Sequence, residues 1–275
     1  MFANSYYALV AGFREYTLDG EMKGFDVEAI LSDVFEVLSS KDKKSVELLY
    51  AYYDCENLIS RHNGSSTYNA LGRLSSEEVE EALRQPSRLI APLAKVVRDY
   101  VLPADEDGEE VDLSQPFAQA LMSAYYNACA ASGSRLLREW SAADRAIRNI
   151  VAATLARRQG IAAESVVVGN DAVAKSLSRS SAADFGLRTE IPYVEQLIAA
   201  VADEQNMVEK ERKIDNIRWS VLSELSTFDY FDINAVIAYL VKVNMVARWA
   251  ALDAKVGREM FDRLVSELND ADINI

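Results

Sequence analysis

Asp, Asn and Arg recur together in helical phrases along this chain, and their side chains are the ones best suited to specific polar contacts. The first phrase is Asp54–Arg61, and a looser version starts at Asp144. The third and fourth are Ile214–Trp219 and Asn244–Trp249. Groups of this kind form hydrogen bonds and ion pairs along and between helices. Helical units that repeat without a nucleophile, a metal set or a phosphate loop predict a scaffold that holds other proteins.

The first phrase supplies the candidate site. Asp54, Asn57 and Arg61 share one face of a helix predicted from about Lys41 to Arg61, because they recur at helical spacing. At 100° per residue they lie opposite the apolar stripe of this helix. The stripe consists of Leu48, Tyr52, Cys55 and Ile59. The polar face is either solvated, with local hydrogen bonds, or a seam against another helix or a partner protein. We take these three residues as the candidate partner or inter-bundle face.

Residues that usually carry catalysis are scarce. His62 is the only histidine and lies in a Gly- and Ser-rich loop, while Cys55 falls on the apolar stripe and is expected to be a buried structural thiol. A single histidine excludes His-based zinc sites and Glu-x-x-His di-iron sites. The sequence contains no Walker phosphate loop and no dinucleotide-binding glycine motif. A site built only from carboxylates stays open, but we predict no enzymatic activity, no metal and no cofactor.

The composition predicts an all-α protein and restricts its partners. Gly (11) and Pro (5) are few in 275 residues, and helix-favouring residues dominate. The net charge of −14 disfavours nucleic acid and anionic lipid as direct partners, because both are bound through clustered Lys and Arg. Two cysteines do not form a disulfide framework, and a reducing cytoplasm fits them.

One segment is long enough to need separate consideration as a membrane span. Leu113–Ser134 carries no charged residue. It includes Gln115, Pro116 and Asn127, which disfavour insertion into lipid. We therefore expect a packed helix of a soluble body here, and the first residues of the chain have no signal-peptide pattern.

Composition shifts along the chain suggest three parts. We predict an N-terminal helical bundle over 1–102, an acidic linker or loop over 103–114, and a helical region over 115–275. Within the last part, apolar stripes predict a compact bundle of about three antiparallel helices at 204–269. The least helical stretch includes a short strand or extended segment near 165–170.

Several helix ends can be predicted from local signals. Ser75 and Glu78 have the spacing of a capping box, and Asp232 precedes an apolar stripe as a candidate N-cap. Gly160 is expected to end a long helix. Pro116 is expected in the first turn of another helix, with Ser114 as its cap.

Some of these residues also resemble a known group of proteins. Tyr6–Gly12, Asp54–Arg61 and Ile214–Trp219 are similar to a bacterial family of uncharacterised proteins encoded among V-type ATPase subunits. Phe228–Leu252 resembles the C subunit of V/A-type ATPases, a central-stalk protein that is called d in eukaryotes, and we refer to this group as the C/d family. In that family, Asp-x-x-Asn helices ending in Arg recur in similar bundles.

The resemblance implies a role without a reaction. The C/d protein is a funnel of helical bundles on the cytoplasmic face of the membrane rotor ring, where it receives the central stalk and passes on torque. We therefore expect a non-catalytic central-stalk subunit with bundles in a curved or funnel-like array. Its partners would be the central-stalk and rotor-ring subunits, and it would reach the inner membrane from the cytoplasm through these proteins only. The alternative is a helical adaptor or peripheral-stalk subunit.

Overall fold

The chain forms an all-α bundle, as its composition predicts. The computed structural model describes residues 5–18, 20, 24–102, 113–202 and 206–272, with side chains of the last helix as far as Leu252; no strand occurs in these ranges. The α-helices of this described part are α1 (Tyr7–Ala11), α2 (Val27–Val37), α3 (Ser40–His62), α4 (Ser76–Arg84), α5 (Ala91–Val101), α6 (Phe117–Ala130), α7 (Arg135–Gln159), α8 (Ala172–Arg179), α9 (Val194–Ala202), α10 (Met207–Leu225) and α11 (Ile233–Asp272). Two short 3-10 helices lie at Pro86–Arg88 and Ala163–Ser165.

Most of the predicted helix ends are where the local signals place them. The capping box of Ser75 and Glu78 is complete, and Asp232 accepts the backbone N–H of Ala235 at the start of α11. Gly160 ends α7 in the left-handed conformation, with φ of +69°. Pro116 itself occupies the N-cap position of α6 and no side chain caps this helix, so the prediction of a Ser114 cap is wrong.

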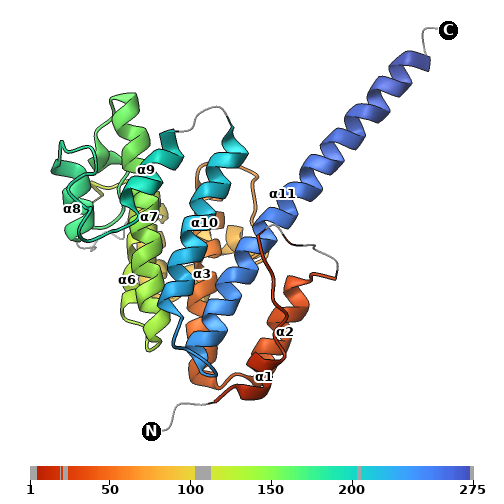
Figure 1. Cartoon of the computed structure of the whole chain (residues 1–275), viewed down its shortest axis with the longest axis horizontal. Coiled ribbons are helices and arrows are strands. Elements are labelled where there is room, and N and C mark those ends of the chain that lie inside the picture. Colours follow the sequence, from red (N-terminus) through yellow and green to blue (C-terminus); the bar gives the residue numbers. More distant parts are fainter. Residues whose placement is uncertain (1–4, 19, 21–23, 103–112, 203–205, 273–275) are drawn as a thin grey trace.

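Two hydrophobic cores lie side by side and share two helices (Figure 1). The first core is formed by α1 to α6, the start of α7, the end of α10 and α11. The second is formed by the rest of α7, by α8 and α9, and by the start of α10. Because α7 and α10 run through both cores without interruption, the cores cannot separate unless these helices break.

The predicted boundary at 103–114 does not separate two packed units. Residues 103–112 lie outside the described part of the chain, but the helices on either side of them, α5 and α6, pack together in the first core. Leu93 and Val97 of α5 are buried with Phe117 and Leu121 of α6. The change from one core to the other occurs instead within α7, where the sequence shows no break in composition.

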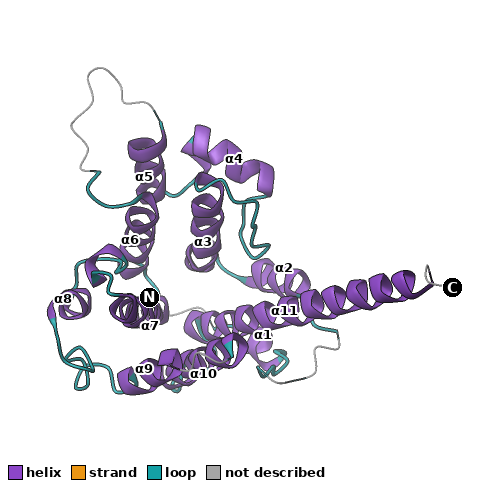
Figure 2. Cartoon of the chain, turned by 90° about the horizontal axis from the view of Figure 1, so that it is seen from above, coloured by secondary structure: helices purple, strands orange, loops and turns teal. Residues whose placement is uncertain are grey.

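The C-terminal third is a hairpin of two helices and not the three-helix bundle predicted at 204–269. After the turn at 226–232, α11 continues to Asp272, and α10 and α11 lie side by side in Figures 1 and 2. The spacing of apolar residues did not distinguish one long helix from two, and α11 continues through Gly257, a residue type that often ends a helix.

Ile233–Leu252, the first half of α11, is the one described segment long and apolar enough to cross a membrane by length and composition, with mean hydropathy 1.4. A core helix passes the same test, and 56% of this segment is buried in the protein. Val236, Ile237 and Leu240 are fully buried in the first core, which accounts for the apolar composition. The charge-free run Leu113–Ser134 likewise contains α6, a core helix.

The segment near 165–170 is irregular. It follows the 3-10 helix at Ala163–Ser165 and leads to α8, with Val167 buried in the second core.

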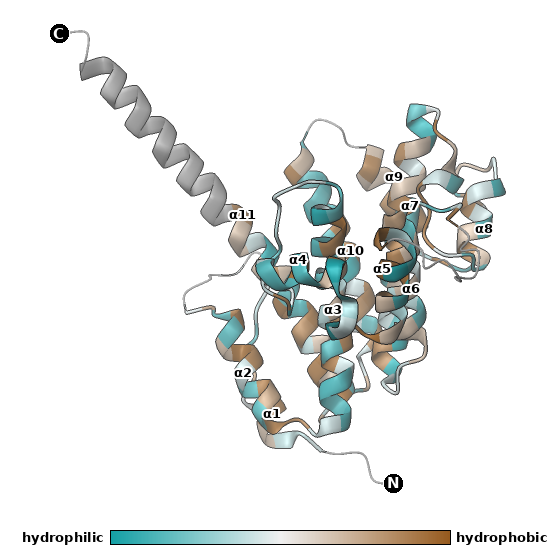
Figure 3. Cartoon of the chain, turned by 180° about the vertical axis from the view of Figure 1, so that it is seen from behind, coloured by the Kyte–Doolittle hydropathy of each residue, from teal (hydrophilic) through white to brown (hydrophobic). Residues whose placement is uncertain are grey.

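Helix α4 is mostly polar, as Figure 3 shows, and only its Val79 and Ala82 are buried. Both short helices, α4 and α8, therefore lie at the surface and are connected to the body by the loops that precede them.

Buried phenols predict alkaline sensitivity. Burial raises the pKa of Tyr50, Tyr125 and Tyr126 above its usual value near 10. Unfolded phenols ionise first as the pH rises, so the free energy of unfolding should fall above about pH 10 by about 1.4 kcal/mol per pH unit for each buried phenol. Urea unfolding over this range, for the wild type and Tyr50→Phe, measures the slope. An identical slope in both proteins would contradict the prediction for Tyr50.

Candidate functional site

A buried network of charged side chains lies between the two cores, with Asp215 at its centre. Asp215, on α10, is 1% exposed. Its carboxylate accepts hydrogen bonds from Arg218 Nη1 at 2.9 Å, from Arg248 Nη1 at 3.0 Å and from Trp249 Nε1 at 2.9 Å. Arg248 also pairs with Glu211. One carboxylate thus connects α10 to α11 through two donors of α11, Arg248 and Trp249, while Arg218 donates to it from α10 itself.

The network continues from α10 to α7 and α6. Arg218 donates through Nε to Asp144 of α7 at 3.3 Å, and the same carboxylate accepts the hydroxyl of Tyr126, on α6, at 2.8 Å. Burial lowers the pKa of Arg218, but the carboxylates of Asp144 and Asp215 outweigh it, so the net shift is upward and the guanidinium stays charged. The two shared helices are therefore cross-connected at the level where they pass from one core to the other.

Helix α3 is attached to the same region by two further contacts. Arg148 of α7 pairs with Glu56 at 3.8 Å, and the hydroxyl of Tyr50 donates to Asn244 Oδ1 of α11 at 2.8 Å. Burial raises the pKa of Glu56, opposed by its hydrogen bond from Asn69. Every Asp/Asn/Arg phrase of the sequence therefore contributes residues to one junction of α3, α6, α7, α10 and α11.

The three predicted site residues form a second polar cluster, in which α3 meets the loop at 69–74 and α4. Asp54 accepts the backbone N–H groups of Arg73 at 2.8 Å and Leu74 at 3.0 Å. Asn57 exchanges two hydrogen bonds with the backbone of Asn69, at 2.7 and 3.0 Å. Burial raises the pKa of the Asp54 carboxyl, and these N–H groups oppose the shift. The two side chains thus hold the loop at 69–74, which we call the clamped loop.

Arg61 completes this cluster by reaching α4. Its Nη2 donates to the hydroxyl of Ser76 at 2.9 Å, and its Nε lies 3.5 Å from Glu80. Asp54 and Asn57 are buried, at 5% and 3% exposure, so the alternative of a solvated face is wrong for them. The described contacts make this face a seam against a loop and helix of the same chain, and contact with a partner stays a prediction.

A second clamp of the same kind precedes α8, and its side chains on α7 belong to the phrase that starts at Asp144. Asn149 exchanges two hydrogen bonds with the backbone of Val168, at 2.8 and 2.9 Å. Arg145 pairs at 2.6 Å with Asp171, the N-cap of α8. Asp144 and Asn149 are five residues apart on α7, so they point in different directions. Asp144 therefore joins the charge network, whereas Asn149 holds the loop that precedes α8.

The first clamp also requires a close approach of backbone. A Cβ atom added at Gly72 would lie 2.6 Å from Asn57 Nδ2 and 2.9 Å from Asp54 Oδ1. Any larger residue there would displace the two side chains that hold the clamped loop. The close approach explains why position 72 is a glycine, although its backbone does not adopt the positive φ that favours glycine.

A family model described as "Protein of unknown function (DUF2764)" matches residues 3–272 of the chain. The chain belongs to this family. No curated protein and no solved structure matches it significantly. The match extends over both cores, the charge network and both clamps of this family member, so the family corresponds to the whole bundle.

Reactive groups in this family member are engaged or buried. The His62 ring packs against Phe117, with ring centroids 4.3 Å apart. Cys55 and Cys129 are free and buried, and burial raises the pKa of the Cys129 thiol to about 12. A thiol of this kind is not a nucleophile near neutral pH. Within the described residues no group of His, Cys, Asp and Glu is placed to hold a metal ion.

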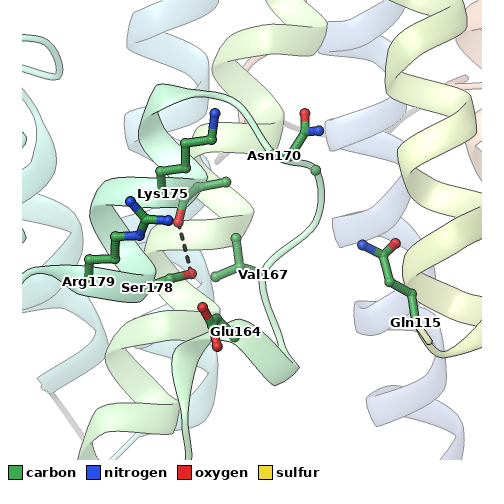
Figure 4. Close-up of a pocket in the computed structure, with 9 residues that line it drawn as sticks. Gln115, Glu164, Val167, Asn170, Lys175, Ser178 and Arg179 are labelled. Carbon is green, nitrogen blue, oxygen red and sulfur yellow. Dashed lines mark hydrogen bonds between the residues drawn. The ribbon is translucent and has the colours of Figure 1, made fainter.

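Two pockets open on the described surface. One, of about 240 Å³, lies between α8 and the segment before it, and Figure 4 shows Gln115 far across it from Ser178 and Arg179. The other, of about 270 Å³, lies beside the clamped loop and includes Asp54, whose carboxylate is already bonded to that loop. Polar side chains, including Glu164, Lys175 and Arg179, line the first pocket, but the bonds that join separate helices lie in the charge network. The charge network is therefore the main polar feature of the molecule.

Proposed function

We propose that this protein is a non-catalytic central-stalk subunit of a bacterial V-type ATPase, coupling the soluble stalk to the membrane rotor ring. The observation that carries the proposal is the charge network at the junction of the two cores. A part that transmits torque must resist twisting between its ends. The bonds of Asp215 and Asp144 join α6, α7, α10 and α11 at the level where such a twist would act.

Continuity of the two shared helices supports the same role. Helices α7 and α10 each contribute buried residues to both cores, and neither helix is interrupted where it passes from one core to the other. Hinge motions usually need a few loop or helix-end residues that absorb the change in backbone angles. The specific assignment to a V-type ATPase rests on the similarity of the phrases described above to the uncharacterised family encoded among ATPase subunits and to the C/d family.

The proposal includes no reaction and no direct contact with lipid or nucleic acid. The polar groups of the network bond to one another, and the buried thiols are unreactive. The net charge of −14 disfavours phosphate-rich partners. Association with the membrane would therefore pass through other subunits.

The test is recovery of the tagged protein from gently solubilised membranes of its own bacterium, with partners quantified by mass spectrometry. We expect rotor-ring and central-stalk subunits in near-stoichiometric amounts. A tagged cytoplasmic protein of similar size and charge is the control. Clean recovery without these subunits would overturn the proposal, and recovery with soluble proteins alone would identify the helical adaptor of the alternative.

A further inference from the structure

Four aromatic side chains gather on the surface where the α10–α11 turn meets α1, and we call them the aromatic turn: Tyr7, Phe228, Tyr230 and Phe231. Phe228 is 85% exposed, and Tyr7 and Tyr230 are 63% and 64% exposed. The Tyr7 and Phe231 rings lie 4.5 Å apart, and the Tyr230 and Phe231 rings 6.5 Å apart. Single exposed apolar residues are ordinary, but a group of aromatic rings at one place marks an interaction surface.

The backbone that carries these rings is held in place from three directions. The N–H of Tyr6 donates to the carbonyl of Phe231 at 2.6 Å. Arg135, at the start of α7, donates to Asp229 at 2.5 Å, and the N–H of Asp229 donates to Ser226 at 3.0 Å. Rings presented on a braced turn lose little freedom when they are bound, which favours affinity.

The charges bonded into the turn select the kind of partner. Asp229 and Glu139 share the single guanidinium of Arg135, and the bonds described for Asp232 join it to neutral groups of its own turn. Three carboxylates against one cation leave a net charge of −2, within a chain of net charge −14. An anionic lipid surface or a second copy of this chain would bring like charges together, whereas a cationic rim would be attracted.

We propose that the aromatic turn docks into an apolar pocket of a partner protein that is rimmed by Lys and Arg. Aromatic residues are enriched among the side chains that dominate binding at protein interfaces, and they act from the centre of a water-excluding contact. Phe228, the most exposed ring, is the anchor of this contact. The inference does not rest on the ATPase assignment, because any partner with this pocket would satisfy it.

The first step of the test places a photo-crosslinking benzophenone amino acid at position 230 of the chain in its source organism. We expect one heterologous protein to be crosslinked, at an apolar site with Lys or Arg beside it. Crosslinks to lipid, to a second copy of this chain, or to no molecule at all would each overturn the proposal.

The second step measures binding of the purified partner to the full chain. Phe228→Ser should weaken binding about tenfold or more, and binding should weaken further as salt is raised. Met207→Ser is the matched control, since Met207 is 66% exposed at the start of α10, and it should change affinity less than about twofold. Circular dichroism confirms that both variants are folded. Equal affinity of Phe228→Ser and wild type would overturn the proposal.

Discussion

Replacing Asp215 by alanine should lower the free energy of unfolding by about 3–5 kcal/mol, the cost typical of breaking a buried ion pair by removing one partner. The carboxylate is almost fully buried and accepts from Arg218, Arg248 and Trp249. Its loss leaves two guanidinium groups and an indole N–H without their acceptor. Arg218 keeps only Asp144, and Arg248 keeps only Glu211 among the bonds described here.

Urea unfolding followed by circular dichroism measures this effect. Asp215→Asn keeps an acceptor for one donor but removes the charge, and it should lie between wild type and alanine. Glu195→Ala is the control, because its pair with Arg188 is exposed and should contribute less than about 1 kcal/mol. A loss below about 1 kcal/mol for Asp215→Ala would show that the network is not what joins the helices.

Replacing Asn57 by alanine should cost about 2–4 kcal/mol, because it leaves both the N–H and the carbonyl of Asn69 without a partner. The effect should be local as well as global. With the clamped loop released, cleavage by a nonspecific protease between His62 and Ser75 should become faster at low urea, before the cores unfold.

Asn63→Ala serves as the matched control for this change. Asn63 lies just after α3 and is exposed, so its loss should alter the free energy of unfolding by less than about 0.5 kcal/mol. If Asn57→Ala cleaves at the wild-type rate and loses no more stability than Asn63→Ala, the clamp does not hold the loop. Gly72→Ala, which intrudes on the same side chains, should resemble Asn57→Ala.

The sequence by itself determined the all-α class, the extent of α3 and the helix ends at Ser75, Gly160 and Asp232. The helix predicted from Lys41 to Arg61 is α3, Ser40–His62, and the capping box at Ser75 and the stop at Gly160 are where they were expected. These features depend on interactions within a few residues, namely a side chain bonding a nearby N–H or a glycine adopting positive φ. The same locality made the all-α class predictable.

Which residues meet was decided by tertiary structure. Helical spacing correctly placed Asp54, Asn57 and Arg61 on one face of α3. It did not show that a loop covers this face, because the loop bonds to it through backbone groups, which leave no signal in the sequence. The boundary expected at 103–114 failed for a related reason: acidic composition reports on solvent exposure and not on whether the flanking helices pack together.

The charge network shows most clearly which contacts cannot be predicted from the sequence. Asp144 and Arg218 are 74 residues apart, and Asp215 and Arg248 are 33 apart. Each phrase was visible in the sequence, yet their pairing depends on the register and rotation with which α7, α10 and α11 pack. Apolar contacts spread over both cores set that register, and no short stretch of sequence contains it. The sequence therefore determined the helical class and the polar phrases, and only the packed bundle decided which charges neutralise each other.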